Sequence, residues 1–168
     1  MLSDRLLNEL NEQIKYEFFS SNLYLAMAGY CYSIDLDGFA NFFVVQAEEE
    51  KFHAMKLFDF VNDMDARVKI SGLDQPENEY NDILDVFEQS LEHEKFVTDR
   101  IYKLMDIAQE EKEHATISML KWFVDEQVEE MSTFRTHLQK LKRAINDSTL
   151  LYAMDDEMAQ RTFVAPTN

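Results

Sequence analysis

Apolar residues recur along this chain in alternating steps of four and three, the spacing of one buried face of an α-helix in a bundle. In the clearest stretch this face runs through Phe39, Phe43, Gln46, Glu50, His53, Leu57, Phe60 and Met64. The same spacing recurs in three other long stretches, and we call each such face a seam. The pattern predicts helices at about residues 4–34, 37–66, 79–108 and 112–145, and a short amphipathic helix at 148–158.

Local signals mark the ends of these predicted helices. Ser3 is a typical N-cap residue before the first helix, and Asp37, in the turn 35–38, is the expected N-cap of the second. Residues 146–148 are expected to end the fourth helix and to cap the fifth. From Arg161 onward no pattern continues, so we expect a frayed end.

Residues 67–79 form the longest break in the helical pattern, and they include Gly72 and Pro76. Antiparallel neighbours in a bundle need only about 2–8 connecting residues. A stretch of this length can span roughly 43 Å, at about 3.3 Å per extended residue, which is enough to return along a whole long helix. We therefore expect a long crossover that leaves the second and third helices parallel.

The composition fits a single all-α domain over residues 1–168. Only 3 glycines and 2 prolines are available for turns, which favours few and long elements. Hydrophobic residues make up 46% of the chain, enough for a sizeable core. The one cysteine, Cys31, falls on an apolar helical stripe, so we expect a buried small hydrophobic residue there.

The chain is strongly acidic, with 33 acidic and 16 basic residues and a formal net charge of −17. This charge argues against nucleic acid and against an anionic membrane as partners, because both require basic patches. It favours the attraction of cations. The first residues lack a signal-peptide pattern and no apolar run reaches membrane-spanning length, so we expect a cytoplasmic location.

Each of the four long helices interrupts its seam near the middle with side chains that can bind metals. Glu50 and His53 lie three residues apart, on one helical face, and a carboxylate with an imidazole suits iron, manganese or zinc. The other three helices carry Glu17, Glu94, and Gln127 with Glu130 at the corresponding places.

These interruptions fall at similar levels. From the turn near residue 35, Glu17 lies 18 residues away and Glu50 lies 15. From the turn near residue 110, Glu94 lies 16 away, Gln127 lies 17 and Glu130 lies 20. At about 1.5 Å per residue these offsets differ by only a few ångströms, so the side chains can meet in one layer.

Buried together, four carboxylates would repel each other and lose their hydration. Two divalent or trivalent cations would offset that cost, and Glu50 is placed to bridge them. The alternatives are a polar layer of protonated acids or a water-filled defect.

At these residues the chain resembles the ferritin family, over nearly its full length. Bacterioferritins carry a second Glu-x-x-His in the fourth helix, whereas this chain has Gln127-Val128-Glu129-Glu130. After the residue matching Glu50, where bacterioferritins place their haem methionine, this chain has Lys51. The resemblance is therefore to prokaryotic non-haem ferritins, and haem is not expected.

The resemblance implies two iron sites per subunit. One is made by Glu17, Glu50 and His53, and the other by Glu50, Glu94 and Glu130 with Gln127 nearby. Tyr24, seven residues after Glu17 on the same face, matches the tyrosine that these ferritins keep beside the centre.

A third iron site is also implied by the resemblance. Glu49, Glu126 and Glu129 each precede a seam residue by one, so they point about 100° away from the seam. In prokaryotic ferritins such residues join Glu130 at a third site. A solvated acidic face is the competing interpretation of the same spacing.

The remaining candidates favour structural roles. His137 lies on the seam about two turns from Glu130, too far to share an ion, and is expected to be a hydrogen-bonded core histidine. His93 and His114 are expected at the surface, and Trp122 in the core.

The function implied by the resemblance is iron storage with ferroxidase activity. Fe(II) would be oxidised by O2 or H2O2 and deposited as ferric oxo-hydroxide inside a homo-oligomeric cage of 24 subunits. Two alternatives belong to other classes: a di-iron oxidase or peroxidase of the same fold that stores nothing, and a helical interaction module. The apolar residues of segment 147–158 must pack on the end of their own bundle or on other copies of the chain, because so short a helix is unstable alone.

Overall fold

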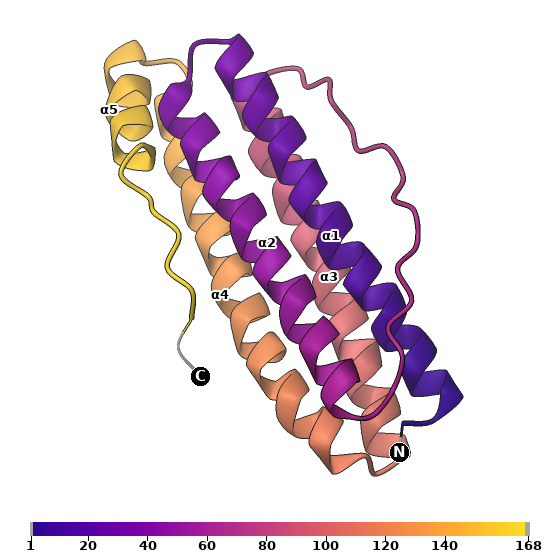
Figure 1. The fold of residues 1–168 in the computed structure, drawn as a ribbon. Coiled ribbons are helices and arrows are strands. Elements are labelled where there is room, and N and C mark those ends of the chain that lie inside the picture. The colour runs from indigo at the N-terminus through magenta and orange to yellow at the C-terminus, as the bar shows by residue number, and fades with distance from the viewer. Residues whose placement is uncertain (1, 167–168) are drawn as a thin grey trace.

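The computed structural model describes residues 2–166, and within that range it contains five α-helices and no β-strand (Figure 1). The helices are α1 (Asp4–Ser33), α2 (Asp37–Asp63), α3 (Ile83–Glu110), α4 (His114–Ala144) and α5 (Ser148–Met158). The predicted all-α bundle with a short fifth helix is confirmed. No helix in the described range is long and apolar enough to span a membrane.

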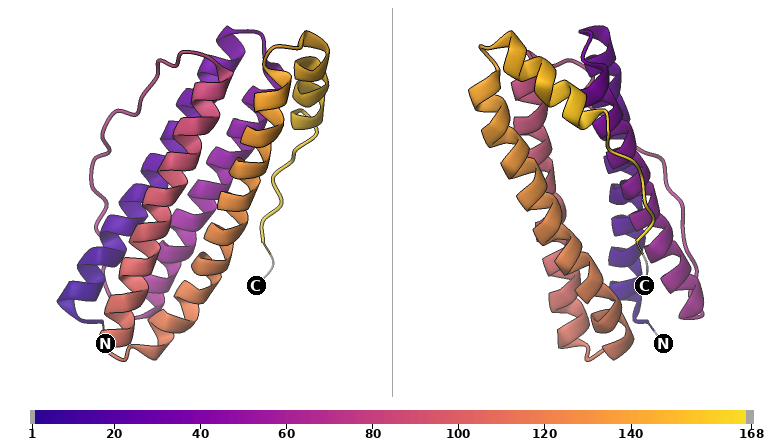
Figure 2. Two further views of the ribbon diagram at one scale, coloured as in Figure 1. Left: turned by 180° about the vertical axis from the view of Figure 1, so that it is seen from behind. Right: turned by 90° about the vertical axis from the view of Figure 1, so that its left-hand side faces the viewer.

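The long helices form two antiparallel pairs, α1 with α2 and α3 with α4 (Figures 1 and 2). Residues 64–82 return along the outside of the bundle, so α2 and α3 run in the same direction, as the length of the crossover predicts. The crossover is longer than expected because α2 ends at Asp63 instead of near residue 66 and α3 begins at Ile83 instead of near residue 79. Asp82 sets this start, since its side chain accepts a hydrogen bond from the backbone N–H of Asp85.

One predicted N-cap is confirmed and another is wrong. Ser3 caps α1 by accepting from the N–H of Leu6. Asp37 is the first residue of α2 and not its cap, because the N-cap position belongs to Leu36, which makes no side-chain bond there. A carboxylate from α5 takes over that function: Asp155 accepts the N–H of Phe39 at 2.9 Å. The fifth helix thereby fixes the start of the helix that carries Glu50.

Three helices end in the same way, with a non-glycine residue in the left-handed conformation. Asp35, Asp65 and Lys112 have φ values of 59°, 54° and 54°, and they follow α1, α2 and α3. After each, the chain closes a Schellman pattern, as in the bond from the N–H of Leu36 to the carbonyl of Cys31. A chain with few glycines thus ends its helices sharply. The places of these ends determine how far along the bundle axis each seam residue lies.

The core is divided in two by a polar layer. At the α5 end, buried aromatic residues dominate; they include Tyr24, Phe39, Phe43, Phe87 and Phe134. At the opposite end the buried residues are mostly aliphatic; they include Leu6, Leu10, Leu57, Ile101 and Leu120. Along every long helix, the polar seam residues lie between these two clusters.

The seams drift at the ends of two helices, which corrects the predicted cores. Phe60 and Met64 are only partly buried, while Val61 is fully buried. In α4 the buried residue is Leu138, and His137 is half-buried beside it. A straight α-helix drifts about 20° per seven residues from a strict four-three count, so the count is accurate near the middle of each helix and less so at its end.

The fifth helix packs on its own bundle. Met154 and Met158 are buried in the aromatic cluster, with Leu151 partly buried against it, whereas Leu150 remains 49% exposed. Residues 161–166 are not frayed as predicted, and residues 167–168, to which the same prediction applies, lie outside the described range. The chain after α5 turns back along the line between α2 and α4 (Figure 2), and Arg161 makes specific contacts there.

A glycine makes the close approach of α5 possible and provides a test of it. A Cβ on Gly38 would lie 1.8 Å from the backbone oxygen of Asp155, whereas a Cβ on Gly29 would meet nothing within 4 Å. Gly38→Ala should therefore push α5 off the bundle and destabilise the protein by about 1–3 kcal/mol. Gly29→Ala should be neutral or stabilising by up to about 1 kcal/mol. Thermal unfolding followed by circular dichroism checks this, and equal melting temperatures for the two variants would contradict the packing of α5.

Candidate metal centre

The polar layer brings together the predicted side chains from all four long helices. Two groups of three ligand-type residues lie there, and in each group one ligand atom per residue falls within 4.8 Å of the others. The first group is Glu17, Glu50 and His53; the second is Glu50, Glu94 and Glu130. All five residues are at most 6% exposed. Glu50 belongs to both groups, so it is the residue that can bridge two ions.

Both groups contain buried polar atoms without a hydrogen-bond partner. These atoms are Glu17 Oε2 and His53 Nδ1 in the first group, and Glu130 Oε2 in the second. His53 Nδ1 lies 3.5 Å from Glu50 Oε2 and 3.8 Å from Glu17 Oε2. Buried polar atoms are normally paired, so unpaired atoms that converge in this way fit the donor set of a cation.

Three buried glutamines hold the carboxylates in place. The side-chain amide of Gln46 donates to Glu50 Oε1 at 3.0 Å and to Glu130 Oε1 at 3.1 Å. Gln127 donates to Glu94 Oε2 at 3.1 Å, which makes it a support for that ligand. The amide of Gln13 donates to Glu17 Oε1 at 2.7 Å. Each glutamine ties up one oxygen of a glutamate and so fixes its orientation.

Tyr24 lies beside this layer, as expected. Its hydroxyl donates a hydrogen bond to Glu94 Oε1, and its ring stacks on the rings of both Phe43 and Phe134, which also stack on each other. Burial, together with the negative charge of Glu94, raises the pKa of Tyr24 well above its usual range. The tyrosine therefore remains a hydrogen-bond donor to a candidate ligand.

Without metal, the layer favours protons on its acids. Burial and the nearby Glu94 carboxylate raise the pKa of Glu50 to about 8. Burial and Glu50 raise the pKa of Glu130 well above the usual range. Burial alone would lower the pKa of His53, but the neighbouring carboxylates of Glu17 and Glu50 outweigh it and raise that pKa. Binding of cations would displace these protons.

The predicted third-site residues lie around a separate cavity of about 290 Å³ between α2 and α4. Its acidic lining consists of Glu49, Glu126, Glu129 and Glu130. Glu126 Oε2 lies 4.0 Å from His53 Nε2, which places this cavity next to the two inner groups. Burial raises the pKa of both Glu49 and Glu126. We call this region the outer carboxylate cavity.

Two of the predictions for histidines are wrong. His93 is partly buried, because its Nε2 lies 2.7 Å from Ser20 Oγ and its ring meets Tyr24 and Phe96. A neighbouring helix covers it, so one step off the seam was not enough to reach solvent. His137 packs on the rings of Phe42 and Phe87, but its buried Nδ1 has no hydrogen-bond partner.

The predictions for His114, Cys31 and Trp122 agree with the structure. His114 is exposed and Cys31 is buried. Trp122 is partly buried and meets the rings of His53 and Phe123, so it packs directly behind a candidate ligand.

Sequence reasoning missed Gln13, Gln46, Arg100 and Arg161 as parts of the site. Arg100, on α3, donates to Gln13 Oε1 at 3.0 Å and so supports Glu17 of α1 through that glutamine. Arg161 reaches Gln46 and Glu49 from the chain after α5. Gln13 and Gln46 had a usable signal, because they lie four residues before Glu17 and Glu50 on the same helical faces.

Comparison with known proteins gives a consistent result. The family model described as a Ferritin-like domain matches residues 7–144. The "Bacterial non-heme ferritin" of Staphylococcus haemolyticus is 45% identical over 97% of this chain and 98% of its own, and that of Staphylococcus epidermidis is 46% identical over the same shares. Among solved structures, an open pore ferritin from Archaeoglobus fulgidus is 41% identical, with a TM-score of 0.95, over 96% of this chain and 100% of its own. An engineered closed form of that ferritin has a TM-score of 0.96 at 41% identity, over 98% of this chain and 100% of its own.

Proposed function

This chain belongs to the ferritin family, as a non-haem ferritin of the prokaryotic type, and from that membership we propose that it is a ferroxidase that stores iron. One observation supports the ferroxidase step above the others. Two buried groups of metal-binding side chains from four helices share a single carboxylate, Glu50. A pair of adjacent ions is what a two-electron reaction with O2 or H2O2 requires.

The reaction balances with iron as the substrate. Two Fe(II) ions give up one electron each and become Fe(III). These two electrons, with two protons, convert O2 to H2O2, or H2O2 to two molecules of water. The protons that Glu50 and Glu130 hold without metal are released when Fe(II) binds. Carboxylate oxygens bind both oxidation states of iron, so the same residues hold substrate and product.

The side chains around the candidate ligands contribute by holding these ligands in position. Gln46 holds one carboxylate oxygen of Glu50 and one of Glu130 and leaves the other oxygen of each for an ion, whereas Gln127 holds Oε2 of Glu94. Tyr24 anchors Glu94 from the aromatic side of the layer. These bonds keep the ligands in position in the absence of iron, so little reorganisation is needed when it binds.

We further propose that the outer carboxylate cavity is a third iron site on the way out of the centre. Two observations support this proposal. Glu126 lies next to His53 of the inner layer, and Glu130 belongs both to the inner layer and to the lining of the cavity. Iron leaving this cavity would be deposited as ferric oxo-hydroxide in a cage, which we place in the cytoplasm.

The inner centre should show two metal ions in each subunit. Anomalous diffraction from crystals soaked anaerobically with Fe(II) is expected to give two peaks about 3–4 Å apart, the spacing of two-metal sites. One peak should lie between Glu17, Glu50 and His53, and the other between Glu50, Glu94 and Glu130. A single peak, or peaks only at the surface, would exclude the proposed mechanism.

Storage further requires a closed assembly, and the exposed side of α5 offers a surface for it. Leu150 is 49% exposed and Tyr152 is 67% exposed, on a helix whose buried residues are Met154 and Met158. Light scattering should give a mass of about 24 times 19.8 kDa. Leu150→Lys should lower that mass by disrupting contacts between copies. A stable dimer of the unchanged protein would favour instead a di-iron oxidase that stores nothing.

A further inference from the structure

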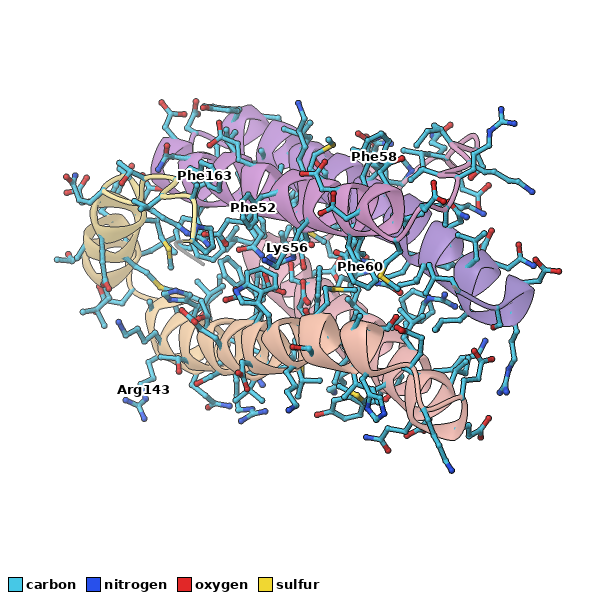
Figure 3. All side chains as sticks on the ribbon, turned by 60° about the horizontal axis from the view of Figure 1, so that its bottom comes forward. Phe52, Lys56, Phe58, Phe60, Arg143 and Phe163 are labelled. Carbon is cyan, nitrogen blue, oxygen red and sulfur yellow. The ribbon has the colours of Figure 1, made fainter. Side chains whose placement is uncertain are left out.

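The chain after α5 packs along α2, and we call residues 159–166 the C-terminal strap. Asn41 of α2 donates to the carbonyl oxygens of Met158 and Arg161, at 3.2 and 2.9 Å. Farther along α2, the ring of Phe163 meets that of Phe52, with centroids 6.4 Å apart (Figure 3). The strap therefore follows α2 from Asn41 to Phe52 and passes over Glu49.

Arg161 is the residue through which the strap reaches the site. Its Nη2 donates to Glu49 Oε2 and to Gln46 Oε1, both at 2.8 Å. Its Nη1 donates to the carbonyl of Phe42 at 3.1 Å, and the guanidinium lies 4.2 Å from the centre of the Phe42 ring. The side chain is 22% exposed. Four interactions thus hold one cation at a fixed place.

That place is the wall of the outer carboxylate cavity. Arg161, Val164 and Pro166 of the strap line the cavity together with its four glutamates. Glu130, only 6% exposed, has an oxygen, Oε2, without a hydrogen-bond partner. The cavity therefore has carboxylate oxygens for a metal ion, but one of its glutamates is already paired with the guanidinium.

Arg161 is also linked to the inner centre through a single residue. It donates to the side-chain oxygen of Gln46, whose nitrogen donates to Glu50 and Glu130. The bond to Arg161 thus fixes which end of the Gln46 amide faces the carboxylates. Arg161 and the two inner carboxylates therefore share one hydrogen-bonding neighbour, Gln46.

We propose that Arg161 is a tethered cation that competes with iron for the outer carboxylate cavity and thereby controls the third binding step. The inference rests on the proposed function, because it assumes that iron uses this cavity. Glu49 cannot give the same oxygen to a metal ion and to Arg161, and a divalent or trivalent ion among these glutamates repels a guanidinium. Iron entering the cavity releases Arg161, and the strap loosens with it.

Competition of this kind is reciprocal, so removing Arg161 should strengthen metal binding in the cavity. A hydrogen bond to a charged group in a partly buried place is worth enough to expect a gain of about tenfold in affinity. Calorimetric titration of the metal-free assembled protein with Fe(II), under strictly anaerobic conditions, measures this without oxidation. The unchanged protein should bind two ions per subunit tightly and a third more weakly. In Arg161→Gln the third should tighten about tenfold while the first two remain.

Arg143→Gln is the matched control. It makes the same change of charge at an exposed arginine that extends away from α4 (Figure 3), and it should leave all three affinities unchanged. Arg161→Lys keeps the charge and should leave the third affinity within a few-fold of the unchanged protein. An unchanged third affinity in Arg161→Gln would overturn the inference, and so would an equal gain in Arg143→Gln. Absence of a third binding step in every variant would overturn it as well.

Hydrogen exchange supplies a readout that does not depend on any substitution. The backbone amides of Gln160 and Arg161, which donate to the carbonyls of Glu157 and Met158, should exchange faster after the third equivalent of Fe(II) than after the second. Exchange that does not change at the third equivalent would mean that the strap is only a structural clamp. Failure of the proposed function is a distinct result, because in that case the first two tight binding steps would be missing too.

Discussion

Replacing Glu50 by alanine is expected to lower the initial rate of Fe(II) oxidation by at least about a hundredfold. The loss of a residue that only supports a metal ligand typically costs 10–100-fold, and Glu50 is the one ligand common to both groups. Its removal would take a carboxylate from both proposed ion sites, and with it the residue proposed to bridge them. Oxygen consumption and the absorbance of the ferric product, measured on the assembled protein, give the rate.

Glu48→Ala is the control for this experiment. Glu48 lies two residues away on the same helix, but it is exposed and outside both groups, so its removal should leave the rate within about twofold. Retention of fast oxidation in Glu50→Ala would refute a shared-carboxylate centre. Loss of activity in both variants would instead indicate a general electrostatic effect on the attraction of Fe(II).

The bundle was predictable because its pattern is long and local. Four seams with one spacing, a crossover too long for a tight turn and few glycines leave little freedom for another fold. The errors fall where local rules compete with tertiary contacts. Asp37 is a good N-cap by composition, yet Asp155 satisfies the N–H of Phe39 from more than a hundred residues away. No local signal encodes that bond.

The inner layer was predictable for a related reason. Its ligands lie near the middle of straight helices, where the four-three count has not yet drifted, and the turns set their levels. Glu17, Glu50 and Glu94 were therefore placed together by counting alone. The same count failed at His137, near the end of a helix, where the buried position had moved to Leu138.

The supporting residues could not be predicted in this way. Arg161 meets Glu49 across 112 positions of the chain, in a segment with no helical period. His93 lies one residue beyond the seam and is covered because Ser20 of α1 faces it. Contacts of this kind depend on the distance between separate segments of the chain. The spacing of residues within one helix does not reveal that distance.

The metal-free protein should become less stable as the pH rises from about 5 to 8. In the unfolded chain Glu50 loses its proton near its ordinary pKa of 4.5, whereas in the folded protein it keeps that proton up to about 8. Between these values the folded state binds more protons, so its stability falls with rising pH, by about 1.4 kcal/mol per pH unit for each proton. His53 acts in the same direction, because its pKa is also raised and its stabilising charge is lost as the pH rises through that raised value.

Glu50→Gln should remove much of this dependence, since an amide keeps the shape of the protonated acid and does not titrate. The melting temperature of the metal-free variant at pH 8 should then exceed that of the unchanged protein, while Glu48→Gln, at an exposed site, should follow the unchanged protein. A bound metal should reverse the direction of this pH dependence. Cations replace the protons on the buried acids, and deprotonation favours their binding. With saturating Zn(II), the stability of the protein should therefore rise from pH 5 to pH 8. Scanning calorimetry at several pH values checks all four curves. A flat profile for the metal-free protein, or the same slope in Glu50→Gln, would mean that the buried acids are held by the protein's own hydrogen bonds and do not await a cation.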